Sequence, residues 1–149
     1  MSAETPRDVV LEELSRAGRK MRALFDARVR ARGVTLSRAR TLLILRRTPG
    51  LNQRELADEL DIETPTLVRL LDGMEKQGFI ERRNVQGDRR AKQIVMTPEG
   101  EKAADEMVAL AQDLRHDLLA DVSEKDIATA VRVLQRISSC ATTSCREGV

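Results

Sequence analysis

Hydrophobic residues recur along the chain first with a helical period, then briefly with an alternating one, and then with a helical period again. Over residues 10–28 the apolar positions are separated alternately by four and three residues, which is typical of one stripe of a long helix. We expect this helix to stop at Gly33. The segment 35–50 predicts a second helix, with Thr35 as its capping residue and a Pro-Gly pair at its end.

Two shorter helices are predicted next, and local signals mark their boundaries. Asn52 is followed three residues later by Glu55, the capping-box arrangement in which each side chain accepts a hydrogen bond from the other residue's backbone N–H. Thr64 is then expected to cap a fourth helix that has Pro65 at its first position, where the missing N–H costs nothing. Gly78 is expected to end that helix in a left-handed conformation.

The period changes to an alternating one after this helix. Segments 79–85 and 91–97 predict two strands, and the Gly87-Asp88 pair between them predicts the turn of a β-hairpin. Helical periodicity then returns. Thr97-Pro98 repeats the cap-then-proline arrangement at the start of a long helix, and a last helix is expected to open at Ser123.

These elements together predict a mainly α-helical fold with one small β-hairpin. Internal repeats and low-complexity linkers are absent from the sequence, so we expect a single domain over residues 1–149. The hydrophobic fraction of 41% and the charged fraction of 34% suit charged helices with aliphatic seams. Neither an apolar run long enough to span a bilayer nor a signal peptide is present, which predicts a cytoplasmic protein without a membrane partner.

Charge is distributed unevenly. The formal net charge of +2 comes from 26 basic and 24 acidic residues, so the total does not point to a polyanionic partner. The predicted hairpin, however, carries a local basic excess. Against the single acid Asp88, the segment 82–92 has five cations, namely Arg82, Arg83, Arg89, Arg90 and Lys92. Such a cluster is either a solvated surface or a contact surface for nucleic acid.

Two short helices joined by a tight turn and followed by a basic hairpin fit a winged helix-turn-helix. In such folds the second helix enters the major groove of DNA, and its first residues reach the base edges. The corresponding segment here is 64–77. Its leading residues are small or form hydrogen bonds, as entry into the groove requires: Thr64, Pro65, Thr66, Val68 and Arg69.

The hairpin would then reach the adjacent minor groove, whose negative potential attracts inserted arginines. Arg89 and Arg90 are the candidates for this contact, and Asp88 is expected to orient one of their guanidinium groups. For Arg69 the competing interpretation is a surface ion pair with Asp72 or Glu75.

The segment 52–100, NQRELADELDIETPTLVRLLDGMEKQGFIERRNVQGDRRAKQIVMTPEG, resembles the DNA-binding core of the MarR family of bacterial transcriptional regulators. The stretches IETPTLVRLLDGMEKQGFI and GDRRAKQIVMT are most similar to its SlyA branch. The resemblance rests on the recognition-helix pattern, the Asp-x-Arg motif of the hairpin and the Thr-Pro-Glu-Gly helix start at fixed mutual spacing.

The resemblance implies an obligate homodimer that binds a pseudo-palindromic operator in double-stranded DNA. It implies a DNA-binding core over about residues 35–97 and dimerisation helices over about 8–32 and 98–140. It also implies release by a small anionic or aromatic effector, held in a pocket that often contains an aromatic residue early in the second helix. This chain has Ala39 near that place.

The sequence has few residues suited to metal binding, redox chemistry or catalysis. His116 is the only histidine, and Cys140 and Cys145 are the only cysteines. We therefore expect no metal site and no cofactor, and inert thiols in place of a redox switch. The sequence has neither a glycine-rich phosphate loop nor a plausible nucleophile-base pair, so we expect no enzyme. A winged-helix module that binds another protein, and not DNA, is the alternative function.

Overall fold

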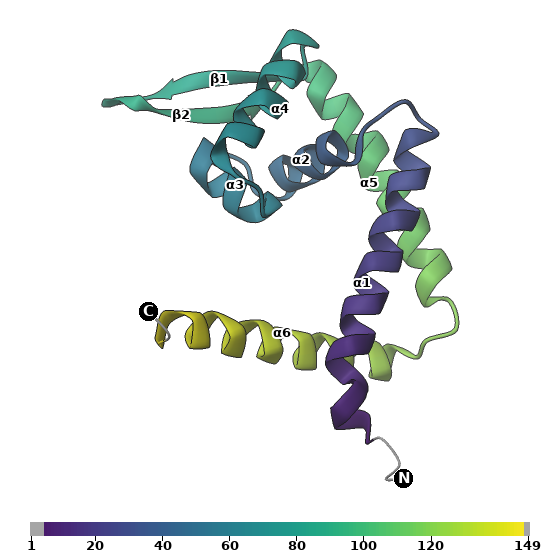
Figure 1. Cartoon of the computed structure of the whole chain (residues 1–149). Coiled ribbons are helices and arrows are strands. Elements are labelled where there is room, and N and C mark those ends of the chain that lie inside the picture. Colours follow the sequence, from purple (N-terminus) through teal and green to yellow (C-terminus); the bar gives the residue numbers. More distant parts are fainter. Residues whose placement is uncertain (1–4, 148–149) are drawn as a thin grey trace. The chain divides into compact units, whose positions relative to one another are not determined.

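The computed structural model describes residues 5–147, without the side chains of residues 89–91 and 144–147. Six helices and a two-stranded antiparallel hairpin form this part of the chain (Figure 1). The predicted mainly α-helical class with one hairpin is confirmed. In chain order the elements are α1 (Pro6–Arg30), α2 (Leu36–Arg47), α3 (Gln53–Leu60), α4 (Thr64–Lys76), β1 (Ile80–Val85), β2 (Asp88–Met96), α5 (Pro98–Leu119) and α6 (Glu124–Glu147).

The chain falls into two compact units, residues 1–114 and 115–149, and each is described by itself. The first unit contains the helix-turn-helix, the hairpin and the core. In the second, none of the described side chains of residues 115–143 is buried, and only Ile127 and Ile137 are half-buried. No helix among the described residues has the length and apolar character needed to cross a membrane.

The core lies between the helices α2, α3, α4 and α5 and the base of the hairpin. Helix α4 contributes Leu67, Leu71 and Met74, each 0% exposed and spaced four and three residues apart along one face. Ile80 and Ile94 from the two strands are also buried. The inner face of α4 is therefore completely covered, while the opposite face of the helix is left outside the core.

Helix ends follow the sequence signals closely. The Glu55 backbone N–H donates to Asn52 Oδ1 and the Asn52 N–H donates to Glu55 Oε2, both at 2.9 Å, so the predicted capping box is confirmed. Thr35 Oγ1 accepts a hydrogen bond from the Arg38 N–H at 3.4 Å, as expected of a cap.

The start of α4 differs from the prediction by one residue. Its N-cap is Glu63, and Thr64 and Pro65 occupy the first two helical positions, so the assignment of Thr64 as the cap is wrong. The physical reason is that the first turn of any helix has several unbonded N–H groups, so a proline is tolerated at more than one position there. The predicted left-handed end is confirmed, since Gly78 has φ of +80°.

The hairpin turn is tighter than the sequence indicated. Val85 pairs with Asp88, which places Gln86 and Gly87 in the turn and makes Asp88 the first residue of β2. Gly87, with φ of +88°, supplies the left-handed conformation that the turn requires. The register runs regularly from Ile80 opposite Met96 to Asn84 opposite Lys92 and then shifts between Asn84 and Val85.

Helix α5 starts directly against the end of α4. The Thr97 hydroxyl donates to the Gly78 carbonyl and accepts from the Gly100 N–H at 3.1 Å, and the Thr97 N–H donates to the Phe79 carbonyl at 3.0 Å. Gly100 packs so closely here that a Cβ atom on it would lie 1.9 Å from the Phe79 carbonyl oxygen. A glycine is therefore required at this position.

We predict that Gly100→Ala destabilises the fold by about 3 kcal/mol or more, because the obstructing atom belongs to the backbone and cannot rotate away. Urea unfolding at fixed protein concentration measures this. Gly73→Ala, in the middle of α4, is the matched control: its new Cβ would meet only Arg38 Nη2 at 3.5 Å. There we expect a gain of up to about 1 kcal/mol from helix propensity. Equal unfolding midpoints for the two variants would contradict the packing argument.

Candidate nucleic-acid interface

The exposed end of α4 begins directly after a tight turn. Asp61 ends α3 in the left-handed conformation, with φ of 55°, and the Ile62 N–H closes the turn on the Ala57 carbonyl at 3.1 Å. Two residues later α4 begins. The candidate groove-facing side chains in its first two turns are exposed or half-buried, whereas Leu67 between them faces the core: Thr64, Pro65 and Thr66 are exposed, Val68 is half-buried and Arg69 is exposed.

Arg69 has no hydrogen-bond or ion-pair partner within the part of the chain that the structure describes. The competing interpretation paired it with Asp72 or Glu75, but both of these carboxylates bind Arg82 instead. The ion-pair interpretation of Arg69 is therefore wrong. Its guanidinium group remains available at the outer face of α4.

The pairing of Arg82 is the feature of this surface that the sequence did not indicate. Arg82 was counted among the hairpin cations, yet its side chain is only 16% exposed. Its guanidinium group donates to Asp72 and to Glu75, with Nη2 and Nε at 2.9 and 3.1 Å from Glu75 Oε2. Nη1 also lies 3.5 Å from Oε1 of Gln53 in α3. Its hydrogen bond to Asp72, together with that to Glu75, raises its pKa above the ordinary value despite partial burial.

The remaining hairpin cations differ from Arg82. Arg83 is exposed and pairs with Glu81 at 3.0 Å, and Lys92 is exposed. The side chains of Arg89 and Arg90 lie outside the described residues, and Asp88 is exposed. With Arg82 and Arg83 both paired to carboxylates, the other three cations of segment 82–92 belong to β2. Figure 1 shows that the hairpin projects beyond α4 toward its turn.

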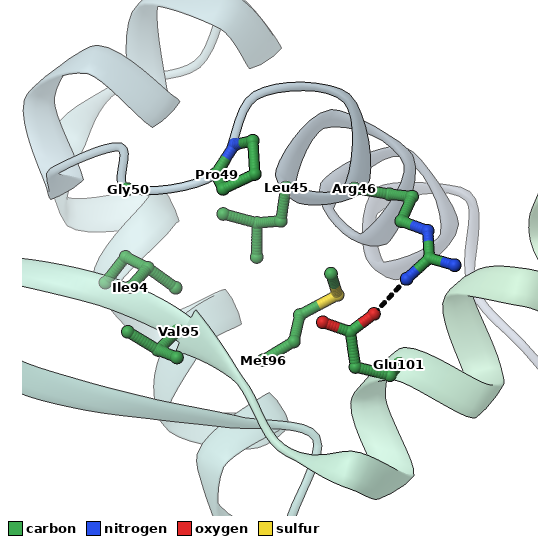
Figure 2. Close-up of a pocket in the computed structure, with 8 residues that line it drawn as sticks. All are labelled: Leu45, Arg46, Pro49, Gly50, Ile94, Val95, Met96 and Glu101. Atoms are coloured by element: carbon green, nitrogen blue, oxygen red, sulfur yellow. Dashed lines mark hydrogen bonds and ion pairs between the residues drawn. The ribbon is translucent and has the colours of Figure 1, made fainter.

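A cavity of about 300 Å³ lies beneath the root of the hairpin (Figure 2). Leu45 from α2 and Ile94 and Met96 from β2 are among its wall residues. Figure 2 shows Ile94 and Val95 on one side of the cavity and, on the other, the guanidinium group of Arg46 directed at the Glu101 carboxylate. Arg46 also pairs with Asp105. This double ion pair joins α2 to α5 next to the hairpin.

A second cavity, of about 310 Å³, is lined almost entirely by apolar groups from α1, α2 and α5. Phe25 contributes an aromatic ring, and Arg22 and Arg40, which have no ion-pair partner among the described residues, are also wall residues. Ala39 lies near the place where the family resemblance implies an aromatic pocket residue. It is fully buried in the core and does not line the cavity. The wall residues are Met21, Arg22, Phe25, Leu36, Arg40, Leu43, Ala111 and Leu114.

A sequence profile of the MarR family matches residues 32–91, which include α2, α3, α4 and β1. The crystal structure of the transcriptional regulator PA3341 is 38% identical and has a TM-score of 0.83; the match covers 89% of this chain and 97% of that one. The chain belongs to the MarR family of transcriptional regulators. Members of this family are regulators of transcription and not enzymes.

Two more distant structures share the fold of this MarR-family regulator. A MarR transcriptional regulator from Methanosarcina mazei Go1 is 20% identical, with a TM-score of 0.78 over 91% of this chain and 98% of the other. MepR of Staphylococcus aureus, crystallised as a complex with DNA, is 23% identical, with a TM-score of 0.74 over 93% and 99% of the two chains. The winged-helix class is therefore confirmed.

The remaining chemical candidates of this MarR-family regulator form no site among the described residues. No group of three or more His, Cys, Asp or Glu side chains in that part of the chain could hold a metal ion. His116 and Cys140 are exposed, and the Cys145 side chain lies outside the described residues. The chemistry that the described residues offer is recognition of anionic or hydrogen-bonding surfaces by α4 and the hairpin.

Proposed function

We propose that this MarR-family regulator is a sequence-specific, dimeric DNA-binding protein that recognises a pseudo-palindromic operator. In this proposal, Thr64, Pro65, Thr66, Val68 and Arg69 of α4 enter the major groove, and Asp88, Arg89 and Arg90 of the hairpin act at the minor groove. Within the family, segments 62–80 and 87–97 support a position near the SlyA branch.

The observation that carries the proposal is the exposed, unpaired guanidinium group of Arg69 within the described part of the chain, while both nearby carboxylates of α4 bind Arg82. An exposed arginine free of ion pairs can form the bidentate contact to guanine that is the commonest specific contact in the major groove. A module that binds another protein would not need this cation on the exposed face of a helix that is followed directly by a basic hairpin. MepR, which shares the fold, was crystallised with DNA, which also favours the DNA-binding function.

Arginines on the helix and on the hairpin should contribute differently to binding. We expect Arg69→Ala to cost about 1–3 kcal/mol, mainly on the cognate sequence, because base-edge hydrogen bonds are lost. Arg90→Ala should weaken cognate and random duplexes more evenly and flatten the salt dependence, because the minor-groove code is degenerate. Binding to an operator fragment and to a scrambled fragment across a salt series measures both effects.

Genomic fragments retained by the purified protein supply the operator for that measurement. Arg19→Ala on α1, outside both DNA-binding elements, controls for the loss of one positive charge. If Arg69→Ala and Arg90→Ala bind both fragments as tightly as the wild-type protein, DNA recognition by these elements is excluded and the protein-binding alternative takes its place.

The homodimer is supported by apolar side chains that the single chain leaves uncovered. Each of the terminal helices has its own set, so α1 and α6 both present an uncovered apolar face. The exposed large hydrophobic residues are Val10, Leu11, Leu14, Met21 and Leu24 in α1, Leu118, Leu119 and Val122 near the end of α5, and Val131, Val133 and Leu134 in α6. Two long helices with this much uncovered apolar surface require a partner, and a second copy of the chain supplies matching faces.

We expect light scattering at micromolar concentration to give twice the 16.7 kDa mass of one chain. Leu134→Glu should dissociate or unfold the dimer, because it places a charge in the apolar face proposed to be buried between the two copies. Gln135→Glu adds the same charge at the neighbouring polar position, outside that apolar face, and should leave the mass unchanged. A folded wild-type particle of one chain mass would rule out the homodimer.

The effector site is proposed at the cavity between α1, α2 and α5. Its apolar walls suit an aromatic body, and two of its wall residues, Arg22 and Arg40, carry guanidinium groups without an ion-pair partner in the described part of the chain, which suit an anionic group at the rim. The aromatic wall residue is Phe25, so the pocket does not depend on an aromatic residue at position 39.

We expect salicylate to bind with a Kd of about 1 mM or below, and the uncharged salicylamide to bind at least about tenfold more weakly. The chain has no Trp or Tyr, so the fluorescence of salicylate can be followed directly. Arg40→Gln should lose the preference for the anion, whereas Arg19→Gln, on α1 outside the cavity, should keep it. Equal binding of the two compounds, or no binding of either, would refute an anion-selective effector pocket.

A further inference from the structure

We infer that Arg82 is a positioning residue that holds the hairpin at a fixed distance from the reading helix, so that the protein recognises one spacing between its major-groove and minor-groove contacts. The role in spacing rests on the proposed DNA-binding function. The mechanical role, a clamp between the hairpin and α4, rests on the contacts of Arg82 alone.

The clamp lies where hydrophobic support for the hairpin ends. Side chains of β1 alternate between two faces, so Ile80, Arg82 and Asn84 lie on the same face. Ile80 is 1% exposed and anchors the root of the strand in the core. Arg82 is the next side chain on that face toward the turn, and there an ionic contact to α4 takes the place of apolar burial.

One guanidinium group links three elements, its own strand and two helices. Arg82 joins β1 to Asp72 and Glu75 on α4 and to Gln53 on α3. Its backbone N–H also donates to Glu75 Oε1 at 3.3 Å, so the same carboxylate binds both the main chain and the side chain of the strand. Because the contacts come from both α4 and α3, they restrict movement of the strand along the surface of α4 as well as away from it.

The arrangement depends on the shape of the guanidinium group as much as on its charge. The planar fork of arginine can donate to two carboxylates and an amide simultaneously, whereas lysine has one ammonium group on a flexible stem. Arg82→Lys therefore keeps the positive charge and removes the simultaneous contacts. Arg46 provides a matched control, because it also pairs with two carboxylates, Glu101 and Asp105, but joins α2 to α5 instead.

The first measurement needs no DNA. Amide hydrogen exchange is compared in the wild-type protein, Arg82→Lys, Arg82→Gln and Arg46→Lys, at a temperature where all four are folded. We expect the amides of β1 and β2 that lie between Ile80 or Ile94 and the turn to exchange at least about tenfold faster in both Arg82 variants. The amides of α2 and α3 should keep their protection. Arg46→Lys should leave the hairpin amides unchanged.

The second measurement tests spacing. The wild-type protein selects a duplex from a random-sequence library, and derivatives of that duplex move the flanking A·T step by one and two base pairs. We expect the wild-type protein and Arg46→Lys to lose about tenfold in affinity for the shifted duplexes, as for a mismatched base pair. For Arg82→Lys the affinities for the original and the shifted duplexes should differ by less than about twofold. Its affinity for the original duplex should be lower than that of the wild-type protein.

Each outcome separates the clamp from the function that it serves. Unchanged hairpin exchange in Arg82→Lys would overturn the clamp. Faster hairpin exchange combined with the wild-type dependence of affinity on spacing would overturn the role in spacing. The same conclusion would follow if Arg82→Gln, and not Arg82→Lys, lost affinity equally for all duplexes, because that pattern marks a phosphate contact. Faster hairpin exchange in a protein that selects no sequence would support the clamp and overturn the proposed DNA-binding function instead.

Discussion

Burial of one face of α4 is the constraint on which the rest of the first unit depends. Leu67, Leu71 and Met74 are each 0% exposed, and burying a side chain of this size contributes about 1.5–3 kcal/mol. A polar contact on the other face contributes about 0.5–1.5 kcal/mol. Apolar packing therefore decides which face of α4 points outward, and polar contacts adjust only what lies next to that face.

The charges around α4 follow from this division. Asp72 and Glu75 are exposed carboxylates on a helix proposed to approach DNA phosphates, where unpaired they would repel the partner. Arg82 pairs with both carboxylates, offsets one of their two negative charges and at the same time holds the hairpin. In the proposed DNA-binding function, one cation of the hairpin thus reduces the repulsion between α4 and a polyanion, and Arg69 is left as the exposed guanidinium group of the helix. A net charge of +2 gives no hint of this arrangement.

Features that depend on neighbouring residues were predictable from the sequence, and those that depend on distant residues were not. The Asn52-Glu55 capping box, the left-handed Gly78 and the start of α5 after Thr97 involve groups within a few residues of one another. The pairing of Arg82 with Gln53 joins positions 29 residues apart, and periodicity carries no information about it.

Local signals also have a limited resolution. Thr64 and Pro65 indicated a helix start, but Glu63 is the cap, because first-turn positions share the same lack of hydrogen-bond partners. The cavity at Phe25 and Arg40 needs three helices to be assembled before it exists, so only the resemblance to a family pointed to a pocket, and it did not identify these wall residues.

Helix α2 links the proposed effector site to the reading helix within the first unit. Its Ala39, Leu42 and Leu45 belong to the same buried core as Leu67 and Leu71 of α4, while its Leu36, Arg40 and Leu43 line the cavity. Close-packed interiors do not deform gradually, so a ligand that displaces the cavity face of α2 must move its core face as well. A ligand at Arg40 would thus change the setting of α4 through apolar contacts, without touching the hairpin clamp. The two proposed devices then act on different degrees of freedom: the effector on the orientation of the reading helix, and Arg82 on the distance from that helix to the hairpin.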